Sequence, residues 1–392
     1  MCSTLGYREI LEGKQVAEFF VGIGLVGIGL ERAGWKMAFA NDIDSGKFEI
    51  FRGHFNGESA KYLVEDVHIL AKRPETVPTV ALATASFPCN DLSLAGSRDG
   101  LSGKQSSAFW GFVKVLEGMG SRRPPLVMLE NVPGFLTSNG GLDFRSALLA
   151  LNDLGYAVDA FIVDAVHFVP QSRQRLFVIG TQDPGPLLLQ DRPREFLESE
   201  TRPAALARFI MDHPEISWFI RNLPDLPTPS AQLEDILEDL PDNSEKWWSS
   251  ERTQYLLDQM SSRHLELAKI MMLKRRWSYG TVFRRMRNGK SMAELRTDGI
   301  AGCLRTPRGG SGRQILFKAG YGRCSARLIT PREAARLMGA SDFRITVSLN
   351  QALFGFGDAV CVPVIEWIAK NYLNPVADEL SKRFLINHSF SS

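Results

Sequence analysis

The chain has few cysteines and lacks the motifs that would pair them. Its 392 residues include five cysteines, an odd number, with no Cys-x-x-Cys pair among them. This pattern argues against a disulfide framework and against a metal site such as zinc. No basic stretch leads into an apolar one at the N-terminus, and glycine, charge or proline interrupts the longest apolar runs. These absences predict a cytoplasmic protein in a reducing compartment, with no membrane association.

Net charge is also small. It is +2, with a pI of about 8.2, so the overall charge does not identify a polyanionic partner. The distribution is more informative, because residues 191–258 carry 15 acidic and 7 basic side chains whereas residues 274–327 carry 14 basic and two acidic ones. This asymmetry predicts a surface that faces a polyanion, with a merely solvated basic face as the alternative.

The first half of the chain alternates apolar, β-rich runs with amphipathic stretches. This alternation predicts an α/β fold in which helices cover a parallel sheet. Strands are expected at Val16–Val21, Lys36–Ala40, Val80–Ala85, Leu126–Glu130, Ala157–Val163 and Arg175–Gly180. Helices are expected around Val26–Ala33, Gly46–Phe55, Ser107–Met119 and Phe144–Leu154. The last two strands follow each other through a short connection, which predicts an antiparallel edge.

From about Asp183 the composition becomes Pro-rich and acidic, then basic and Gly-rich until about Arg327. The regular alternation stops there, which predicts a second, smaller domain. The expected division is a large domain at 1–183, a small one at 184–326 and a return to the large one at 327–392. A helix is expected at Pro331–Leu337, and Ala359–Tyr372 should be a buried segment that leads into a terminal helix.

A glycine loop follows the first expected strand. Gly22, Gly24 and Gly27 form a G-x-G-x-x-G pattern, and Asp42 and Asp44 follow about one strand later. Glycines let a backbone approach a ligand closely, and a carboxylate accepts hydrogen bonds from ribose hydroxyls. The loop therefore predicts a nucleotide site, which fits a dehydrogenase as well as a methyltransferase.

A second group of residues distinguishes the two. Cys89 follows the strand Val80–Ala85, Glu130 ends the strand Leu126–Glu130, and Arg173 and Arg175 precede or begin a third strand. A cysteine, a carboxyl group and two guanidinium groups should therefore meet at one edge of the sheet. A dehydrogenase would leave them unexplained.

At this point the sequence resembles the DNA cytosine-5 methyltransferase family, of the prokaryotic restriction-modification type. Seven blocks occur in the family's order: Phe20-x-Gly22-x-Gly24, Asn41-Asp42-Ile43-Asp44, Pro88-Cys89-Asn90, Glu130-Asn131-Val132, Gln171-x-Arg173-x-Arg175, Arg327-Leu328-Ile329-Thr330-Pro331-Arg332-Glu333 and Gly357-Asp358-Ala359-Val360. Departures from the family pattern are Glu18, Leu25, Asn90 and Asp358-Ala359. The resemblance implies a Rossmann-like, S-adenosylmethionine-dependent methyltransferase sheet with a smaller target-recognition domain.

The chemistry follows from the residues at the sheet edge. The Cys89 thiolate is placed to add to carbon 6 of cytosine, which makes carbon 5 nucleophilic. Glu130 should bond N3 of the ring, as the family's matching glutamate implies, while Asn131 holds the loop. Arg175 and Arg173 should contact the O2 oxygen of the base. A structural ion pair between Glu130 and Arg175 is the alternative.

The resemblance also implies how ligands are bound. Phe20 and Ile43 would pack on the two faces of the adenine, Asp42 would bind the ribose, and Asp44 would cap a helix near Ser45. The resemblance further assigns Gly22, Gly24, Asp66, Val67 and Pro88 to the cofactor site. Extrusion of the target cytosine needs a closing loop, for which the segment Asp91–Gly100, with Ser93 and Arg98, is suited.

The basic segment Cys303–Gln314 lies where the family keeps its recognition region. Arginine and glutamine read guanine and adenine in the major groove, so Arg308, Arg313 and Gln314 are the expected base readers, and Arg305 is a further expected nucleic-acid-binding residue. The expected partner is double-stranded DNA, with a separate restriction endonuclease as a companion and a monomeric state. The alternatives are an RNA cytosine-5 methyltransferase on the same scaffold and a DNA-binding module with an inactive site.

Overall fold

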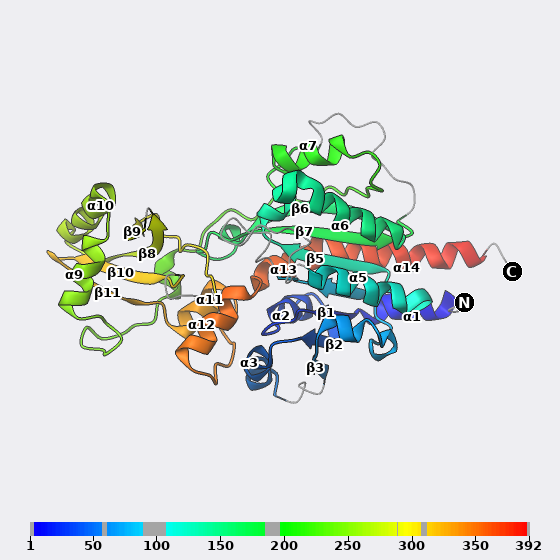
Figure 1. Ribbon diagram of the computed structural model, residues 1–392, viewed down its shortest axis with the longest axis horizontal. Helices are drawn as coiled ribbons and strands as arrows, with labels where there is room; N and C mark the ends of the chain where they lie inside the picture. The colour runs from blue at the N-terminus through cyan, green and yellow to red at the C-terminus, as the bar shows by residue number, and fades with distance from the viewer. Residues whose placement is uncertain are drawn as a thin grey trace. The chain divides into compact units, whose positions relative to one another are not determined.

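The computed structural model describes residues 4–56, 61–88, 107–184, 197–287, 289–306 and 312–389. The chain divides into two compact units, each with its own β-sheet (Figure 1). Unit 1 comprises Met1–Val163, Gln174–Leu226 and Val364–Ser392, and unit 2 comprises Asp164–Arg173 and Pro227–Pro363.

Unit 1 contains a sheet of seven strands in the described residues: β1 (Gln15–Phe19), β2 (Lys36–Asp42), β3 (Tyr62–Val64), β4 (Leu82–Ala85), β5 (Leu126–Asn131), β6 (Tyr156–Asp164) and β7 (Gln174–Gln182). Their order is β3-β2-β1-β4-β5-β7-β6. The pairs from β3 to β5 are parallel, and β7 is antiparallel to β5. The predicted α/β class is thus confirmed.

The strand order changes direction between β1 and β4. Ligands of open α/β sheets bind beyond the carboxyl ends of strands at such a point. The glycine loop follows β1, and the segment that leads to Cys89 follows β4. The topology therefore brings the two sequence motifs to the same region of the sheet edge.

The antiparallel edge predicted at the last two expected strands is present: β7 is antiparallel to β5, and β6 is the outermost strand. In β7 the consecutive residues Leu176–Thr181 are all buried. The outermost strand β6 is almost as fully buried, and residues 217–219 hydrogen-bond to it at Val158.

The helices of unit 1 are α1 (Thr4–Gly13), α2 (Leu25–Glu31), α3 (Ser45–Phe55), α4 (Val67–Leu70), α5 (Ser107–Met119), α6 (Leu142–Asp153), α7 (Ala204–Asp212), most of α13 (Val362–Ile368) and α14 (Asn374–Ser389). Side chains of α5 and α6 pack on one face of the sheet, where the rings of Phe19 and Phe112 lie 5.0 Å apart. On the other face the ring of Tyr372, from the C-terminal segment, stacks on Phe161 of β6 at 5.7 Å. Helices thus surround the sheet (Figure 1).

The unit boundaries differ from the expected ones at 183 and 327. Residues 197–226 belong to unit 1, because Leu206, Phe209 and Trp218 join the main apolar core and Arg202 forms a buried ion pair with Asp159 at 2.9 Å. Residues 327–363 belong to unit 2, where Arg327 pairs with Glu333 at the start of α11. The Arg202–Asp159 pair joins residues that are 43 positions apart in the sequence.

Unit 2 is built on an antiparallel sheet with the order β11-β10-β8-β9, from β8 (Ser278–Arg287), β9 (Lys290–Arg296), β10 (Ile315–Gly320) and β11 (Arg323–Leu328). Its helices are α8 (Leu233–Ile236), α9 (Ser250–Asp258), α10 (Ser262–Leu273), α11 (Pro331–Leu337) and α12 (Leu349–Asp358). Val282 and Phe317 pack with α9 and α10 on one face of the sheet. On the other face, Lys318 and Arg327 lie 5.5 and 5.0 Å from the ring of Trp247.

The helical stretch Leu349–Arg383 is long and apolar enough to cross a membrane by length and composition. However, 67% of its most apolar window is buried inside the protein. The apolar side chains of this stretch pack in the protein core. Val364, Ile365 and Ile368, for example, are almost fully buried.

Candidate functional site

The glycine loop adopts a backbone that favours glycine. Phe20, Gly22 and Gly24 have φ values of +56°, +59° and +85°. A Cβ atom at Gly24 would lie 2.6 Å from the Phe55 ring and 2.9 Å from the Phe51 ring, so a side chain cannot fit there. For Phe20 this left-handed conformation costs roughly 1–3 kcal/mol, a strain that is typical of functional sites.

Asp42 closes the loop from the end of β2. Its Oδ2 accepts a hydrogen bond from the Gly22 N–H at 2.9 Å, and its Oδ1 accepts one from the Asp44 N–H at 3.0 Å. Asp44 in turn caps α3 by accepting from the N–H groups of Gly46 and Lys47, which confirms its predicted capping role. Of the two acids, Asp42 is the one that contacts the glycine loop.

The side chains beside this loop suit a nucleoside. Ile43 follows Asp42 and is 67% exposed, an unusual state for an isoleucine at the end of a buried strand. Asp66 caps α4 by accepting from the His68 N–H at 2.8 Å, and Val67 is buried. A carboxylate, an exposed apolar surface and a loop lined by glycine together match the sugar, the base and the close backbone approach of an adenosine-containing ligand.

Glu130 and Arg175 form an ion pair at the carboxyl end of β5. Arg175 Nε lies 2.8 Å from Glu130 Oε1, and the two side chains are 16% and 9% exposed. Arg175 also donates to the carbonyl oxygen of Gln174 at 2.8 Å. A carboxyl group that is held near a fixed guanidinium can bond the edge of a ring that offers both donors and acceptors.

Asn131 fixes the backbone just before Cys89. Its Nδ2 donates to the carbonyl oxygen of Phe87 at 3.2 Å, and its Oδ1 accepts from the Val132 N–H at 2.9 Å. The Phe87 ring is buried against Phe109 and Phe135. The chain is therefore anchored at Phe87, between the end of β4 and the half-buried Pro88. Four predicted site residues lie outside the described part of the chain: Cys89, Ser93, Arg98 and Arg308.

Arg173 does not fit its predicted contact with the base, because its guanidinium is buried among carbonyl groups of unit 2. It is 2% exposed and donates to the carbonyl oxygens of Leu304 at 2.8 Å and Gly357 at 3.2 Å, as well as to Ala359 and the Cys303 sulfur. These bonds tie three separate segments together. In this structure Arg173 is a structural arginine, whereas Arg175 faces Glu130.

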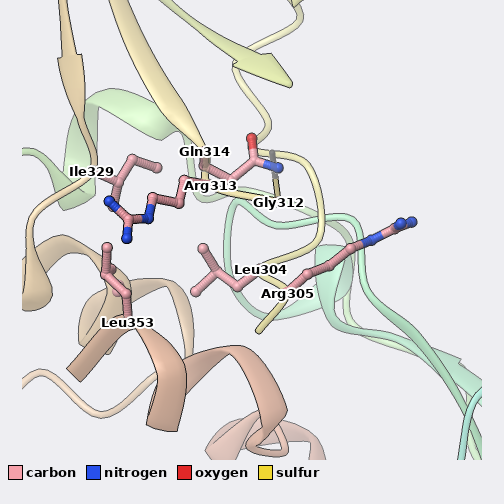
Figure 2. Close-up of a pocket in the computed structure, with 8 residues that line it drawn as sticks. Leu304, Arg305, Gly312, Arg313, Gln314, Ile329 and Leu353 are labelled. Atoms are coloured by element: carbon pink, nitrogen blue, oxygen red, sulfur yellow. The ribbon is translucent and has the colours of Figure 1, made fainter. Parts of the chain in front are cut away.

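Three of the expected nucleic-acid-binding residues line one pocket, but their side chains differ in direction and exposure. Arg305, Arg313 and Gln314 line a small pocket of unit 2 together with Leu304, Gly312, Ile329, Ala334 and Leu353. Figure 2 shows the side chains of Arg305 and Arg313 extending in opposite directions. Arg305 is exposed and lies 5.3 Å from the Phe283 ring. Arg308 is outside the described residues.

Gln314 does not fit the role of a base reader. It is 5% exposed, its Nε2 donates to the Cys303 carbonyl at 3.4 Å, and a Cβ at Gly302 would lie 2.8 Å from that nitrogen. The backbone carbonyl of Gln314 also accepts from the Ile329 N–H. The amide is thus packed inside unit 2, where it supports the segment that carries Arg305.

Two buried polar residues lie next to the glycine loop: sequence reasoning missed Tyr62 and gave Glu18 only as a departure from the family pattern. Tyr62, on β3, donates its hydroxyl to the Gly22 carbonyl at 3.1 Å. Glu18, on β1, is 2% exposed, and burial raises the pKa of its carboxyl well above the usual range, with Glu31 and Asp42 adding to the rise. Tyr62 gives no sequence signal, because a tyrosine in a short apolar run resembles an ordinary strand residue.

The comparisons with known proteins agree with this geometry. Residues 14–374 match the family model described as C-5 cytosine-specific DNA methylase. The Type II methyltransferase M.HhaI of Haemophilus parahaemolyticus is 23% identical over 365 residues, which cover 92% of this chain and 94% of the relative. M.DsaV of Dactylococcopsis salina, also a Type II methyltransferase, is 27% identical over 369 residues, 93% and 88% of the two chains.

A solved structure, the Entamoeba histolytica methyltransferase EhMeth, has the same fold with a TM-score of 0.62 and 16% identity, covering 93% of this chain and 98% of its own. The family model spans the glycine loop, the segment around Cys89, the Glu130–Arg175 pair and the whole of unit 2's sheet. The chain therefore belongs to the family of C-5 cytosine-specific DNA methylases, and is a DNA methyltransferase.

Proposed function

We propose that this enzyme transfers the methyl group of S-adenosylmethionine to carbon 5 of a cytosine that it extrudes from duplex DNA. The observation that carries the proposal is the Glu130–Arg175 pair, which lies beside the anchored Phe87–Pro88 backbone that leads to Cys89. The match to the family model supports the same reaction and the DNA substrate over the RNA alternative.

The glycine loop, Asp42 and Ile43 fit S-adenosylmethionine. Asp42 would accept hydrogen bonds from the ribose hydroxyls, Ile43 and Phe20 would cover the adenine, and Val67 and Pro88 would border the pocket. Asp66 would address the adenine edge through its backbone, since its carboxylate caps α4. When bound, S-adenosylmethionine supplies an electrophilic methyl group on a positively charged sulfur.

Cys89 supplies the nucleophile. Its thiolate adds to carbon 6 of cytosine, and the electrons of the 5,6 double bond make carbon 5 reactive toward the methyl group. After methylation, removal of the proton from carbon 5 restores the double bond and expels the thiolate. Asn131 supports this step by holding the Phe87 carbonyl, which fixes the direction in which the chain enters the Cys89 segment.

Glu130 and Arg175 stabilise the charge that develops in the ring. The carboxyl group of Glu130 would bond N3 and the exocyclic amine, and Arg175 would donate to O2. The 2.8 Å ion pair fixes both groups before the base arrives, so little reorganisation is needed. Extrusion of the cytosine would be completed by the polar, Gly-containing segment Asp91–Gly100, which includes Ser93 and Arg98.

Unit 2 is proposed as the target-recognition region. Its β8–β9 hairpin carries Arg285 and Arg287, whose side chains are 53% and 63% exposed. Together with Arg305 these residues form an exposed basic set that suits phosphates and guanine edges. Arg308 and Arg313 remain proposed as base readers because of their place in the basic segment. Gln314 is instead proposed to support the segment that carries Arg305, because it is buried and bonded to Cys303.

The relatives are Type II methyltransferases, so the enzyme is proposed to protect DNA in a restriction-modification system, beside a separate endonuclease. It would act as a monomer on the nucleoid in the bacterial cytoplasm. The proposal is tested by incubation of the protein with labelled S-adenosylmethionine and duplex DNA of varied sequence, followed by mapping of modified cytosines. A label found on adenine, on RNA alone or on neither nucleic acid would contradict it.

A further inference from the structure

Tyr62 occupies a position that packing alone does not explain. Its ring is 7% exposed and lies in an aromatic cluster, 5.0 Å from Phe48 and 4.8 Å from Phe51. Phenylalanine would fill this space equally well. A buried hydroxyl must instead find a hydrogen-bond partner, and that of Tyr62 donates to the Gly22 carbonyl at 3.1 Å.

The contacts at Gly22 fix two different peptide planes. The Gly22 N–H, bonded to Asp42 Oδ2, belongs to the peptide that joins residues 21 and 22. The Gly22 carbonyl, bonded to Tyr62, belongs to the peptide that joins residues 22 and 23. Gly22 has a φ of +59° and no Cβ, so its φ and ψ angles can vary more widely than those of other residue types. The two hydrogen bonds therefore do most to hold these peptide planes in place.

In a trans peptide the carbonyl and the following N–H point in opposite directions. When Tyr62 draws the Gly22 carbonyl toward β3, it therefore turns the Ile23 N–H to the opposite side of the loop. The same aromatic cluster borders Gly24, since Phe51 packs on the Tyr62 ring and lies 2.9 Å from where a Cβ at Gly24 would be. Tyr62 is thus connected to both left-handed glycines of the loop.

The register of the sheet places Tyr62 beside the proposed ribose ligand. Ala40 pairs with Tyr62 and Asp42 with Val64 on the parallel strands β2 and β3, so Tyr62 and Asp42 lie on the same face of neighbouring strands. Burial, together with the nearby carboxylates Asp42, Glu18 and Asp44, raises the pKa of Tyr62. The hydroxyl consequently keeps its proton and remains a donor.

We propose that Tyr62 is a positioning residue for the methyl donor: its hydroxyl fixes the peptide between Gly22 and Ile23, so that the cofactor meets a preorganised loop. The inference rests on the proposed binding of S-adenosylmethionine at this loop. A loop that is ordered before binding loses less entropy when the ligand arrives, and this difference appears in affinity.

The test is Tyr62→Phe, which removes one oxygen and keeps the aromatic cluster. Tyr156→Phe is the matched control, because Tyr156 is also buried in unit 1 and donates its hydroxyl to a carbonyl, that of Pro124, at 2.7 Å. Calorimetric titration with S-adenosylhomocysteine should show a dissociation constant raised roughly three- to tenfold in Tyr62→Phe and unchanged in Tyr156→Phe. The Tm of both variants should fall by a similar amount.

Kinetics give a second measurement. Tyr62→Phe should raise KM for S-adenosylmethionine and leave kcat at saturation within about twofold of the wild type. The titrations are run in the cold, where the loss of one hydrogen bond leaves the protein folded. Equal affinity of Tyr62→Phe and wild type, or equal weakening in both variants, would overturn the inference. If the wild-type protein itself binds no methyl donor, the proposed function fails as well.

Discussion

The Nε atom of Arg175 lies 2.8 Å from Oε1 of Glu130, and the two residues stand on the antiparallel strands β7 and β5. Glu130 pairs with Phe177, which lies two residues after Arg175 on β7. Arg175 therefore reaches the carboxylate from beyond the carboxyl end of β5. Each side chain is mostly buried, which means that the loss of either charge leaves its partner poorly compensated. Stability should therefore depend on this pair, and in the proposed mechanism catalysis should depend on it as well.

Glu130→Gln separates these two roles. The amide keeps the shape of the side chain and can still accept a hydrogen bond from Arg175, so we expect the protein to remain folded with a lowered Tm and with S-adenosylmethionine affinity unchanged. Methyl transfer should fall about 100-fold or more, since a group that stabilises developing charge is lost. Single-turnover rates on duplex DNA measure the effect. A variant with wild-type rates would show that the pair is only structural.

Cys89→Ser tests the covalent step. The hydroxyl is a far weaker nucleophile than a thiolate at neutral pH, so we expect no methyl transfer and no trapped adduct on DNA that contains 5-fluorocytosine. Fluorine at carbon 5 prevents the final proton removal, and only a covalent mechanism leaves a stable complex. Denaturing gels detect the adduct. Cys324→Ser, a change in unit 2 well separated in sequence from Cys89, should trap DNA as the wild type does.

Much of unit 1 was predictable because its elements follow local patterns. The expected helix Ser107–Met119 is α5, and the expected helix Pro331–Leu337 in unit 2 is α11, with the same bounds. In both, apolar residues recur with helical spacing. The three-residue strand β3 was missed, because Tyr62–Val64 is too short to show a period.

The sheet of unit 2 was also missed. Its strand β8 places Arg284, Arg285 and Arg287 among apolar residues, which hides the alternation that marks a strand. The roles of Arg173 and Gln314 depend on partners far along the chain, such as Leu304 and Gly357 for Arg173. Such contacts are fixed by tertiary packing, which leaves no local pattern to recognise.

Glu18→Gln should make stability less dependent on pH. Burial raises the pKa of Glu18 in the folded state, so the folded protein holds a proton that the unfolded chain releases near the usual glutamate pKa. The stabilising effect of this proton is complete at low pH and is lost as the pH rises from that value through the raised folded pKa. The wild type should therefore lose up to about 1.4 kcal/mol per pH unit relative to Glu18→Gln within this window.

Urea unfolding of both proteins at several pH values between 5 and 8, chosen at roughly one-unit spacing, measures this difference. Glu379→Gln is an opposite control, because its hydrogen bond with Arg221 lowers the pKa of Glu379. Removal of that carboxylate should cost a constant amount of stability over this pH range, because the lowered pKa lies below it and the cost would vanish only as the pH falls through that pKa. A constant difference between wild type and Glu18→Gln at every pH would contradict the ionisation argument.

The β8–β9 hairpin should bind phosphates. Arg285 and Arg287 share Glu294 as an ion-pair partner, at 3.2 and 2.6 Å, so one acid compensates two cations. Replacing both with glutamine should weaken binding to all duplexes alike and lower the slope of log K against log salt by about two units. Arg145→Gln is the control, because Arg145 is an exposed, ion-paired arginine of unit 1. Equal slopes for the hairpin variant and the wild type would move the phosphate contacts elsewhere.

Arg305 and Gln314 should differ in what their loss affects. Arg305 is exposed, so Arg305→Ala should leave the Tm unchanged and cost about 1–3 kcal/mol of discrimination at one base position. Gln314 is buried and bonded to Cys303, so Gln314→Ala should lower stability by about 1 kcal/mol without altering the sequence that is methylated. Base-resolution maps of modified cytosines, combined with melting curves, distinguish the two. Because the two residues line the same pocket, a shift in sequence preference in Gln314→Ala alone would mean that Gln314 turns outward to the DNA and that Arg305 does not read it.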